Sequence, residues 1–116
     1  MIYKPVHDAH NRLLKEVLSD PEARGIYEAT KLQIELSMQL KKARKKRHMT
    51  QDDVAEIMDT HKPVVSRLES GEDDVKHFPS LLTIAKFASA VGYEIKFALI
   101  PMKNVRLKKH RKKKNN

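Results

Sequence analysis

The sequence of 116 residues predicts a mainly α-helical fold with one β-strand near its C-terminal end. Three observations support this prediction. The chain is 40% hydrophobic but only 5% aromatic, which favours an aliphatic core built by helices. Apolar residues recur every three or four positions through most of residues 21–91, and this spacing is typical of amphipathic helices. After Gly92 the spacing changes to two, which predicts a strand.

The first helix signal is Asp20-Pro21-Glu22. It combines a capping carboxylate, a proline at the first helical position and an acid near the positive end of the helix dipole. We expect a helix over residues 21–30, weakened by Gly25. Residues 1–19 are weakly patterned, with apolar side chains only at a short amphipathic turn: Leu13, Leu14, Val17 and Leu18. The sequence therefore predicts an N-terminal extension, residues 1–30, with one short helix.

A second and stronger helix is predicted over residues 31–47. It ends in the basic run KKARKKR, from Lys41 to Arg47, which complements the negative end of the helix dipole. A solvated helix end and a phosphate-facing surface are both compatible with this run, and we favour the second because of the motif that follows. The apolar positions that suit this helix are Leu32, Leu36, Leu40 and Ala43, joined by Ile34 and Met38.

Residues 49–71 read MTQDDVAEIMDTHKPVVSRLESG and contain two short helical patterns joined by a tight turn. Thr50 and Asp53 form an acidic variant of the capping box for a helix over residues 51–58. Pro63 fits the first turn of a second helix, which Gly71 ends. Two such helices predict a helix-turn-helix. The expected inward side chains are Val54, Ala55, Met58, Val65 and Leu68.

The second motif helix leaves a polar edge that faces outward. Lys62, Ser66 and Arg67 lie on this edge together with Val64, and such a helix fits the major groove of DNA. The sequence therefore predicts a DNA-reading helix within a helix-turn-helix domain, residues 31–92.

Ser80 is the expected cap of a last helix, which ends at Gly92. The strand follows over residues 93–101, with Pro101 at its end. A lone strand is unstable in water, so we expect it to pair with the same strand of a second copy, or alternatively with a partner protein's sheet. The expected dimerisation residues are Tyr93, Ile95, Phe97 and Leu99.

The formal net charge is +9, and residues 102–116 carry eight Lys or Arg and no acid, so the remainder carries +1. Such a one-sided distribution is typical of a polyanion binder, although basic tails also serve solubility. The chain has no cysteine, no signal-peptide pattern and no apolar run long enough to span a bilayer. We expect a cytoplasmic protein, associated with the nucleoid when it is bound to DNA, without a membrane partner.

No catalytic arrangement is predicted. The six histidines are scattered, and only His7 and His10 have the spacing of helical metal ligands, without a third ligand nearby. No Ser-His-Asp set or carboxylate pair stands out. The sequence therefore predicts no enzyme, no metal site and no cofactor.

The segments TQDDVAEIM and VVSRLESG, followed by FPSLLTIAKFASAVG, resemble the Xre/Cro family of phage-repressor-type DNA-binding domains over residues 36–92. The resemblance implies that Gln51 binds a DNA phosphate, and that Arg44 and Glu69 form a structural salt bridge. The chain departs from the family at the turn, where Asp59 replaces the usual Gly, and at Pro63 and Val64, which replace polar readers. The DNA-contacting residues that we expect on this basis are Lys46, Arg47, Thr50, Gln51, His61, Lys62, Val64, Ser66 and Arg67.

The segment DPEARGIYEATKLQIELSMQL before the motif, and the ending YEIKFALIP, resemble HigA-type antitoxins. That family implies a homodimer that represses its own operon and neutralises a HigB/RelE-like mRNA interferase. Toxin contacts are then expected at Leu13, Leu14, Ile26 and Tyr27. The alternatives are a stand-alone Xre-family repressor, a HipB-like antitoxin of a kinase, and an interaction module whose DNA face has decayed.

Overall fold

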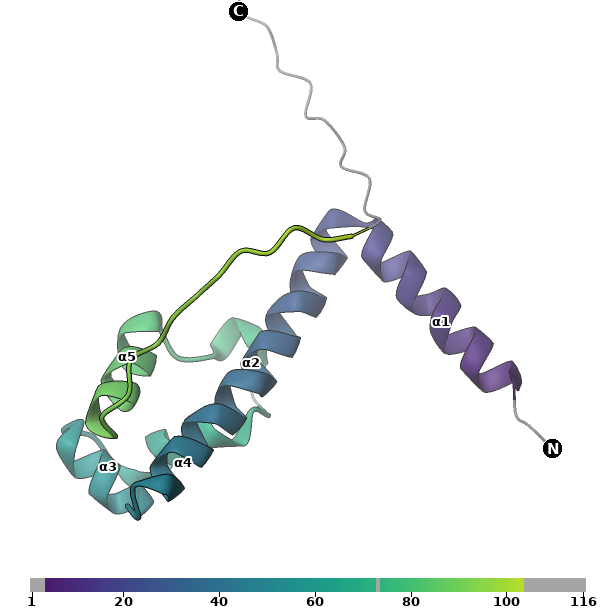
Figure 1. Cartoon of the computed structure of the whole chain (residues 1–116). Coiled ribbons are helices and arrows are strands. Elements are labelled where there is room, and N and C mark those ends of the chain that lie inside the picture. Colours follow the sequence, from purple (N-terminus) through teal and green to yellow (C-terminus); the bar gives the residue numbers. More distant parts are fainter. Residues whose placement is uncertain (1–3, 73, 104–116) are drawn as a thin grey trace, which may run out of the picture.

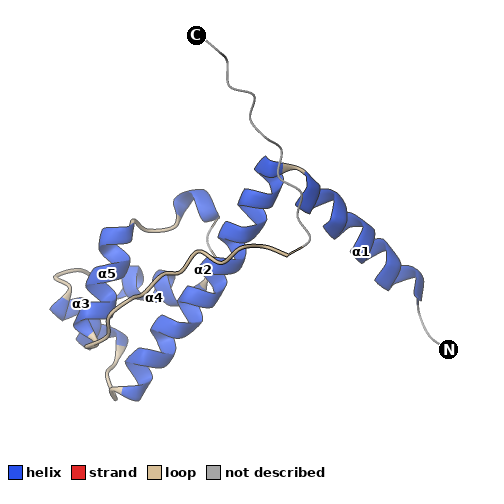
Figure 2. Ribbon diagram, turned by 45° about the horizontal axis from the view of Figure 1, so that its top comes forward, coloured by secondary structure: helices blue, strands red, loops and turns tan. Residues whose placement is uncertain are grey.

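The computed structural model describes residues 4–72 and 74–103, and all the regular elements in these ranges are helical (Figure 2). They are α1 (Lys4–Ser19), α2 (Pro21–Lys46), α3 (Gln51–Ile57), α4 (Lys62–Ser70), a 3-10 turn η1 (Val75–His77) and α5 (Leu81–Ala90). Figure 1 shows α2 as the axis of the molecule. Helices α3, α4 and α5 cluster around its C-terminal half, whereas α1 joins its N-terminal end and points away from that cluster.

The predicted break between residues 30 and 31 is wrong, because Pro21–Lys46 is one continuous helix. No proline follows Pro21 within it. The Thr30 hydroxyl bonds back to the Ile26 carbonyl at 2.9 Å, which keeps this residue compatible with a helix. Residues 4–19 are also more ordered than their weak pattern indicated, since they form α1. The boundary expected at residue 31 therefore lies inside a helix.

The caps confirm the expected helix ends. Asp20 accepts a hydrogen bond from the Ala23 backbone, and Ser80 accepts one from the Thr83 backbone. Thr50 and Asp53 form the complete reciprocal capping box of α3. Gly71 ends α4 in the left-handed conformation at φ 67°, where the absence of a side chain removes the steric cost.

The core confirms the inward face of the motif, because Val54, Ala55, Met58, Val65 and Leu68 are all buried. Sequence analysis missed Phe87, which is fully buried in α5. Of the apolar positions that suited α2, Leu40 is buried, and Leu36 and Ala43 pack at the edge of the core. The exposed positions are Leu32, Ile34 and Met38.

The segment over residues 93–101 contains no strand in the described chain. It runs as an extended arm from the end of α5 toward the N-terminal end of α2 (Figures 1 and 2). A strand needs a neighbour to complete its hydrogen-bond ladder, and the described part of this single chain offers none. We refer to residues 93–101 as the arm.

Candidate nucleic-acid interface

A buried ion pair fixes α4 against α2. The Arg44 guanidinium donates to the Glu69 carboxylate through Nε at 2.6 Å and through Nη2 at 3.0 Å. Arg44 also donates to the Met49 carbonyl at 2.8 Å. Both residues are less than a tenth exposed. This two-point contact confirms the salt bridge that the family resemblance implied, and it holds both members in one orientation.

The environment of Arg44 favours its charged form. The hydrogen bond to Glu69 raises the pKa of the Arg44 guanidinium; burial acts in the opposite direction, and the charge of Glu69 adds to the increase. Because folding raises the pKa of Arg44, the stability that this residue contributes is fully present at every pH below its pKa in the unfolded chain. That pKa is already strongly alkaline, so the contribution is lost only at still higher pH. Arg44 therefore stays charged at every pH at which DNA binding would be measured.

Gln51 joins the same network from α3. Its Nε2 donates to Glu69 Oε1 at 3.1 Å, and the side chain is partly buried. Glu69 therefore connects the C-terminal part of α2, the start of α3 and the end of α4. This contact was not foreseen, and a helical-wheel argument cannot reveal it because it joins residues on different helices.

The turn between α3 and α4 is tight and well bonded. Asp59 adopts a left-handed backbone with φ 57°, which confirms that it can replace glycine there. The Thr60 amide donates to the Ala55 carbonyl at 2.8 Å. Ala55 is 3% exposed, so the space it occupies leaves little room for a larger side chain. The backbone of Asp59, the hydrogen bond from Thr60 and the buried Ala55 therefore fix the position of α4 relative to α3.

The outward edge of α4 is where the sequence placed it. His61, Lys62, Ser66 and Arg67 are exposed, whereas Val65 and Leu68 on the other side of the helix are fully buried. Val64 lies between these two groups, because it is half-buried and packs against the core. The helix therefore presents a cation at each end of a short polar edge.

The basic end of α2 divides into two parts. Lys46 and Thr50 are exposed near the start of α3. Arg47 turns the other way: its Nε donates to the Val91 carbonyl at 2.9 Å and its Nη2 to the Gly92 carbonyl at 3.1 Å. Its guanidinium also lies 4.9 Å from the centre of the Tyr93 ring. These contacts give Arg47 a structural role at the root of the arm, and its expected DNA contact stays a prediction.

The expected partner-binding residues lie outside the helix-turn-helix. Leu13 on α1 and Ile26 on α2 are more than half exposed, whereas Leu14 and Tyr27 are half-buried. On the arm, Phe97 and Leu99 are highly exposed, Ile95 packs against the core, and Tyr93 lies under Arg47. The residues expected to bind DNA, a partner protein and a second copy therefore lie on three separate parts of the chain: the edge of α4, the N-terminal helical region and the arm.

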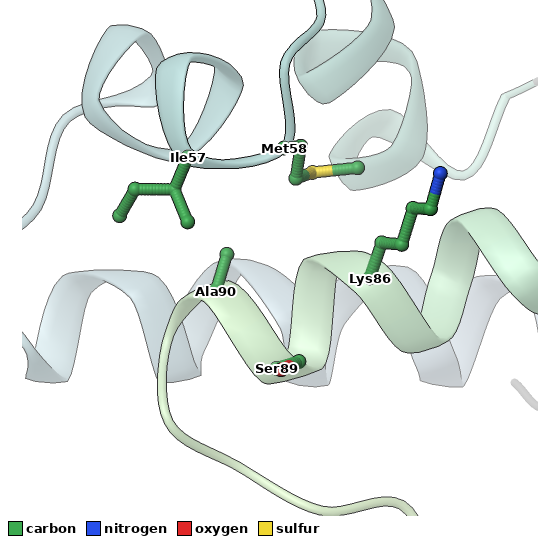
Figure 3. A pocket seen from close by; sticks show the side chains of 5 residues that line it. All are labelled: Ile57, Met58, Lys86, Ser89 and Ala90. Atoms are coloured by element: carbon green, nitrogen blue, oxygen red, sulfur yellow. The ribbon is translucent and has the colours of Figure 1, made fainter.

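Figure 3 shows a shallow pocket of about 300 Å³ between the end of α3 and α5. Ile57 points toward Ala90 across it, and the Met58 side chain extends toward the side of Lys86 (Figure 3). Lys86 and Ser89 of α5 also line it. The lining contains no carboxylate or imidazole, so it offers no acid–base pair.

Neither a membrane-spanning helix nor a metal-binding cluster of His, Cys, Asp and Glu occurs among the described residues. The His7 side chain, one half of the His7–His10 spacing, lies outside the described part of the chain.

The sequence model of a family described as helix-turn-helix matches residues 40–97, which is half of the chain. The chain belongs to this Xre-type helix-turn-helix family. Members are DNA-binding regulatory domains, and the match covers α3, the turn, α4, α5 and the first part of the arm. No curated protein and no solved structure matches the chain.

Proposed function

We propose that this protein binds a specific palindromic DNA operator as a homodimer and represses transcription from it. The observation that carries the proposal is the division of α4 into two sides. Val65 and Leu68 are fully buried and Glu69 is held by Arg44, while Lys62, Ser66 and Arg67 remain exposed. A helix fixed in this way can enter the major groove without rearranging.

Each residue of the proposed interface has a role that follows from its chemistry. Lys62 and Arg67 can donate to guanine O6 and N7, and Ser66 can bond to several bases. Lys46, Thr50, Gln51 and His61 are assigned to phosphates, which position the protein without reading sequence. Val64 is assigned a smaller contact with a thymine methyl group, because it is half-buried.

Binding to the DNA upstream of the protein's own gene tests this proposal. Arg67→Ala should weaken binding to that DNA by about 1–3 kcal/mol and relax sequence choice. Lys46→Ala should weaken binding to specific and unrelated duplexes to a similar extent, because a phosphate contact carries no sequence information. Lys86→Ala is the matched control, since this exposed lysine lines the pocket beside α5. Unchanged affinity of Arg67→Ala in a gel-shift titration would contradict the assignment of α4 as the reading helix.

The basic tail has a separate proposed role, and residues 104–116 lie outside the described residues. If the tail binds phosphates, deletion of residues 103–116 should make the plot of log affinity against log salt shallower. The slope should change by about 0.9 for each phosphate that the shortened protein no longer neutralises. An unchanged slope would assign the tail to solubility.

We further propose that the protein is an antitoxin, with a HigB/RelE-like mRNA interferase bound at its N-terminal end. What supports this is an exposed apolar surface on a projecting helical arm. Leu13 is 60% exposed and Ile26 is 51% exposed, and Figure 1 shows α1 directed away from the DNA-binding cluster. Leu14 and Tyr27 are assigned to the edge of this surface.

The antitoxin proposal is tested with the protein encoded by the neighbouring reading frame. Because α2 is continuous, the informative truncation begins at Asp20, which keeps the cap of α2. This truncation should bind DNA as well as the full chain and should lose the neighbouring protein in a pull-down. Leu13→Asp should have the same effect in the full chain, with Lys15→Asp as its exposed control. Retention of the complex by both the truncation and Leu13→Asp would place the partner surface elsewhere on the chain. Absence of any complex with the full chain would favour the stand-alone repressor.

A further inference from the structure

The root of the arm is held by three groups of contacts. Arg47 binds the carbonyls of Val91 and Gly92, and its guanidinium stacks over the ring of Tyr93. The Tyr93 amide donates to the Ala88 carbonyl at 2.8 Å. We call this set of contacts the Arg47 clasp. The clasp therefore engages the main-chain carbonyls of Val91 and Gly92 and the main-chain amide of Tyr93. It directs the arm back along α2.

Beyond the clasp, the backbone of the arm is unpaired within the described residues. Within the described chain, no main-chain group of residues 94–100 bonds to another main-chain group. Pro101 has no N–H to donate, so a hydrogen-bond ladder cannot continue through it. The available stretch is therefore seven residues long, bounded by the clasp at one end and by Pro101 at the other.

Three apolar side chains of this stretch are also largely exposed. Phe97 is 79% exposed, Leu99 is wholly exposed and Ile100 is 79% exposed. A groove of about 530 Å³ separates the arm from α2. Its apolar lining includes Leu32 and Leu36 of α2 together with Ile95, Phe97 and Leu99 of the arm. A chain with unpaired edges and an open apolar groove of this kind is prone to pairing.

We infer that residues 94–100 pair antiparallel with the same residues of a second copy, with Phe97 opposite itself on the twofold axis. This inference rests on the proposed homodimer and assigns its register. Ile95 then lies opposite Leu99 of the second copy, and Lys96 lies opposite Ala98. The apolar face formed by Ile95, Phe97 and Leu99 packs over the groove beside Leu32 and Leu36.

The clasp decides between this register and its main competitor. A register centred on Ile95 would place Glu94 opposite Lys96 of the second copy, and opposite charges across strands are favourable. However, the clasp leaves only residues 94–96 available to that register, whereas the register centred on Phe97 uses all seven residues. Each main-chain hydrogen bond contributes at least as much as one exposed cross-strand charge pair. The register centred on Phe97 has four more residue pairs, and these outweigh the two charge pairs of the register centred on Ile95. Arg47 thus acts as a positioning residue, because the clasp shortens the competing register.

The absence of cysteine from the chain allows a direct test by disulfide cross-linking of the full protein. Directly opposed residues of antiparallel strands have Cα atoms about 4.5 or 5.5 Å apart, and both distances suit a disulfide. Phe97→Cys should cross-link to itself under mild oxidation. Ile95→Cys and Leu99→Cys should each fail to do so alone, because their copies lie about 14 Å apart along the strands. A refolded mixture of Ile95→Cys and Leu99→Cys, in which Phe97 is intact, should cross-link as a heterodimer.

The outcomes separate the register from the proposed dimer. Self-cross-linking of Ile95→Cys would overturn the register in favour of the competing one. Failure of every variant to cross-link, while sedimentation shows a dimer, would overturn the arm pairing and leave the dimer standing. A monomer that still binds its operator in a gel shift would overturn the dimer together with the register, and would leave DNA recognition standing.

The role of the clasp has its own readout. Arg47→Gln should be combined with each cysteine substitution in a double variant. In this background Ile95→Cys should cross-link to itself, because the arm can then shift to the competing register. Arg47→Lys cannot donate to both carbonyls while stacking on the ring, so it should show an intermediate pattern. An unaltered cross-linking pattern in Arg47→Gln would show that the clasp does not set the register.

Discussion

The helix-turn-helix and the arm are both rich in apolar side chains, but only the first buries them within its own chain. In α3 and α4 the core is filled by Val54, Ala55, Val65 and Leu68. Arg44, Gln51 and Glu69 bond across three helices. The arm is adjacent in the fold, yet Phe97, Leu99 and Ile100 remain exposed. One region buries most of its apolar side chains within the described chain, and the other leaves three large ones exposed.

This difference indicates how the two proposed activities divide the work. A DNA-reading edge must be rigid before it meets DNA, because ordering it on binding would reduce affinity. An assembly segment can remain unpaired until a second copy arrives, provided that its direction is fixed beforehand. The Arg47 clasp supplies that direction.

The largest contrast is expected from the same substitution in each region. Phe87 is fully buried and Phe97 is 79% exposed. Phe87→Ala should lower the free energy of unfolding by about 3–5 kcal/mol. Phe97→Ala should change it by no more than about 0.5 kcal/mol at concentrations where the protein is monomeric, and should weaken dimerisation. Urea unfolding measured over a range of protein concentrations separates the two effects. Equal losses of stability would mean that the arm already belongs to the core of the monomer.

A second contrast uses two acidic residues that each lie near a cation. Glu69 is buried against Arg44 at 2.6 Å, whereas Glu94 and Lys96 are exposed and 3.9 Å apart. Glu69→Ala should lower the free energy of unfolding by about 3–5 kcal/mol, because it leaves a buried guanidinium without its carboxylate. Glu94→Ala should change it by less than about 1 kcal/mol. Thermal unfolding of both variants provides the measurement, and a small effect of Glu69→Ala would show that Arg44 finds another partner.

A smaller effect is expected where α4 ends. Gly71 has φ 67°, and a Cβ atom there would lie 3.3 Å from the Cβ of Ser37. Gly71→Ala should therefore cost about 1–2 kcal/mol of stability. Gly25 is the matched control, because it lies within α2 and a Cβ atom would meet nothing within 4 Å. Gly25→Ala should stabilise the protein by up to about 1 kcal/mol. A Gly71→Ala variant as stable as the parent would contradict the left-handed end of α4.

The sequence predicted the helix-turn-helix accurately because its signals are local. Thr50, Asp53 and Gly71 act through hydrogen bonds and backbone angles within a few residues, and Val65 and Leu68 follow the helical period. Phe87 could have been found by the same rule, since residues 84, 87 and 88 of α5 and its C-cap residue 91 are buried at helical spacing.

The remaining differences have a non-local cause. Periodicity shows that Leu32, Ile34 and Met38 are apolar, but it cannot show whether a neighbour covers them. The basic run likewise could not reveal that Arg47 turns toward Val91 and Gly92, because those residues lie more than forty positions away. The charge pattern of a sequence therefore predicts a basic run but not the contacts that each of its side chains makes. The assigned DNA contacts themselves remain proposals.

Selection of binding sites from a random pool of DNA duplexes tests the central claim most directly, because it assumes no operator. Two copies of a fixed reading helix joined by a twofold pairing of their arms should enrich a palindrome. Its half-sites should be centred about one helical turn, 34–36 Å, apart, and the Arg67→Ala protein should lose preference at one symmetric position in each half-site. Enrichment of a single half-site, or of no sequence at all, would contradict the account.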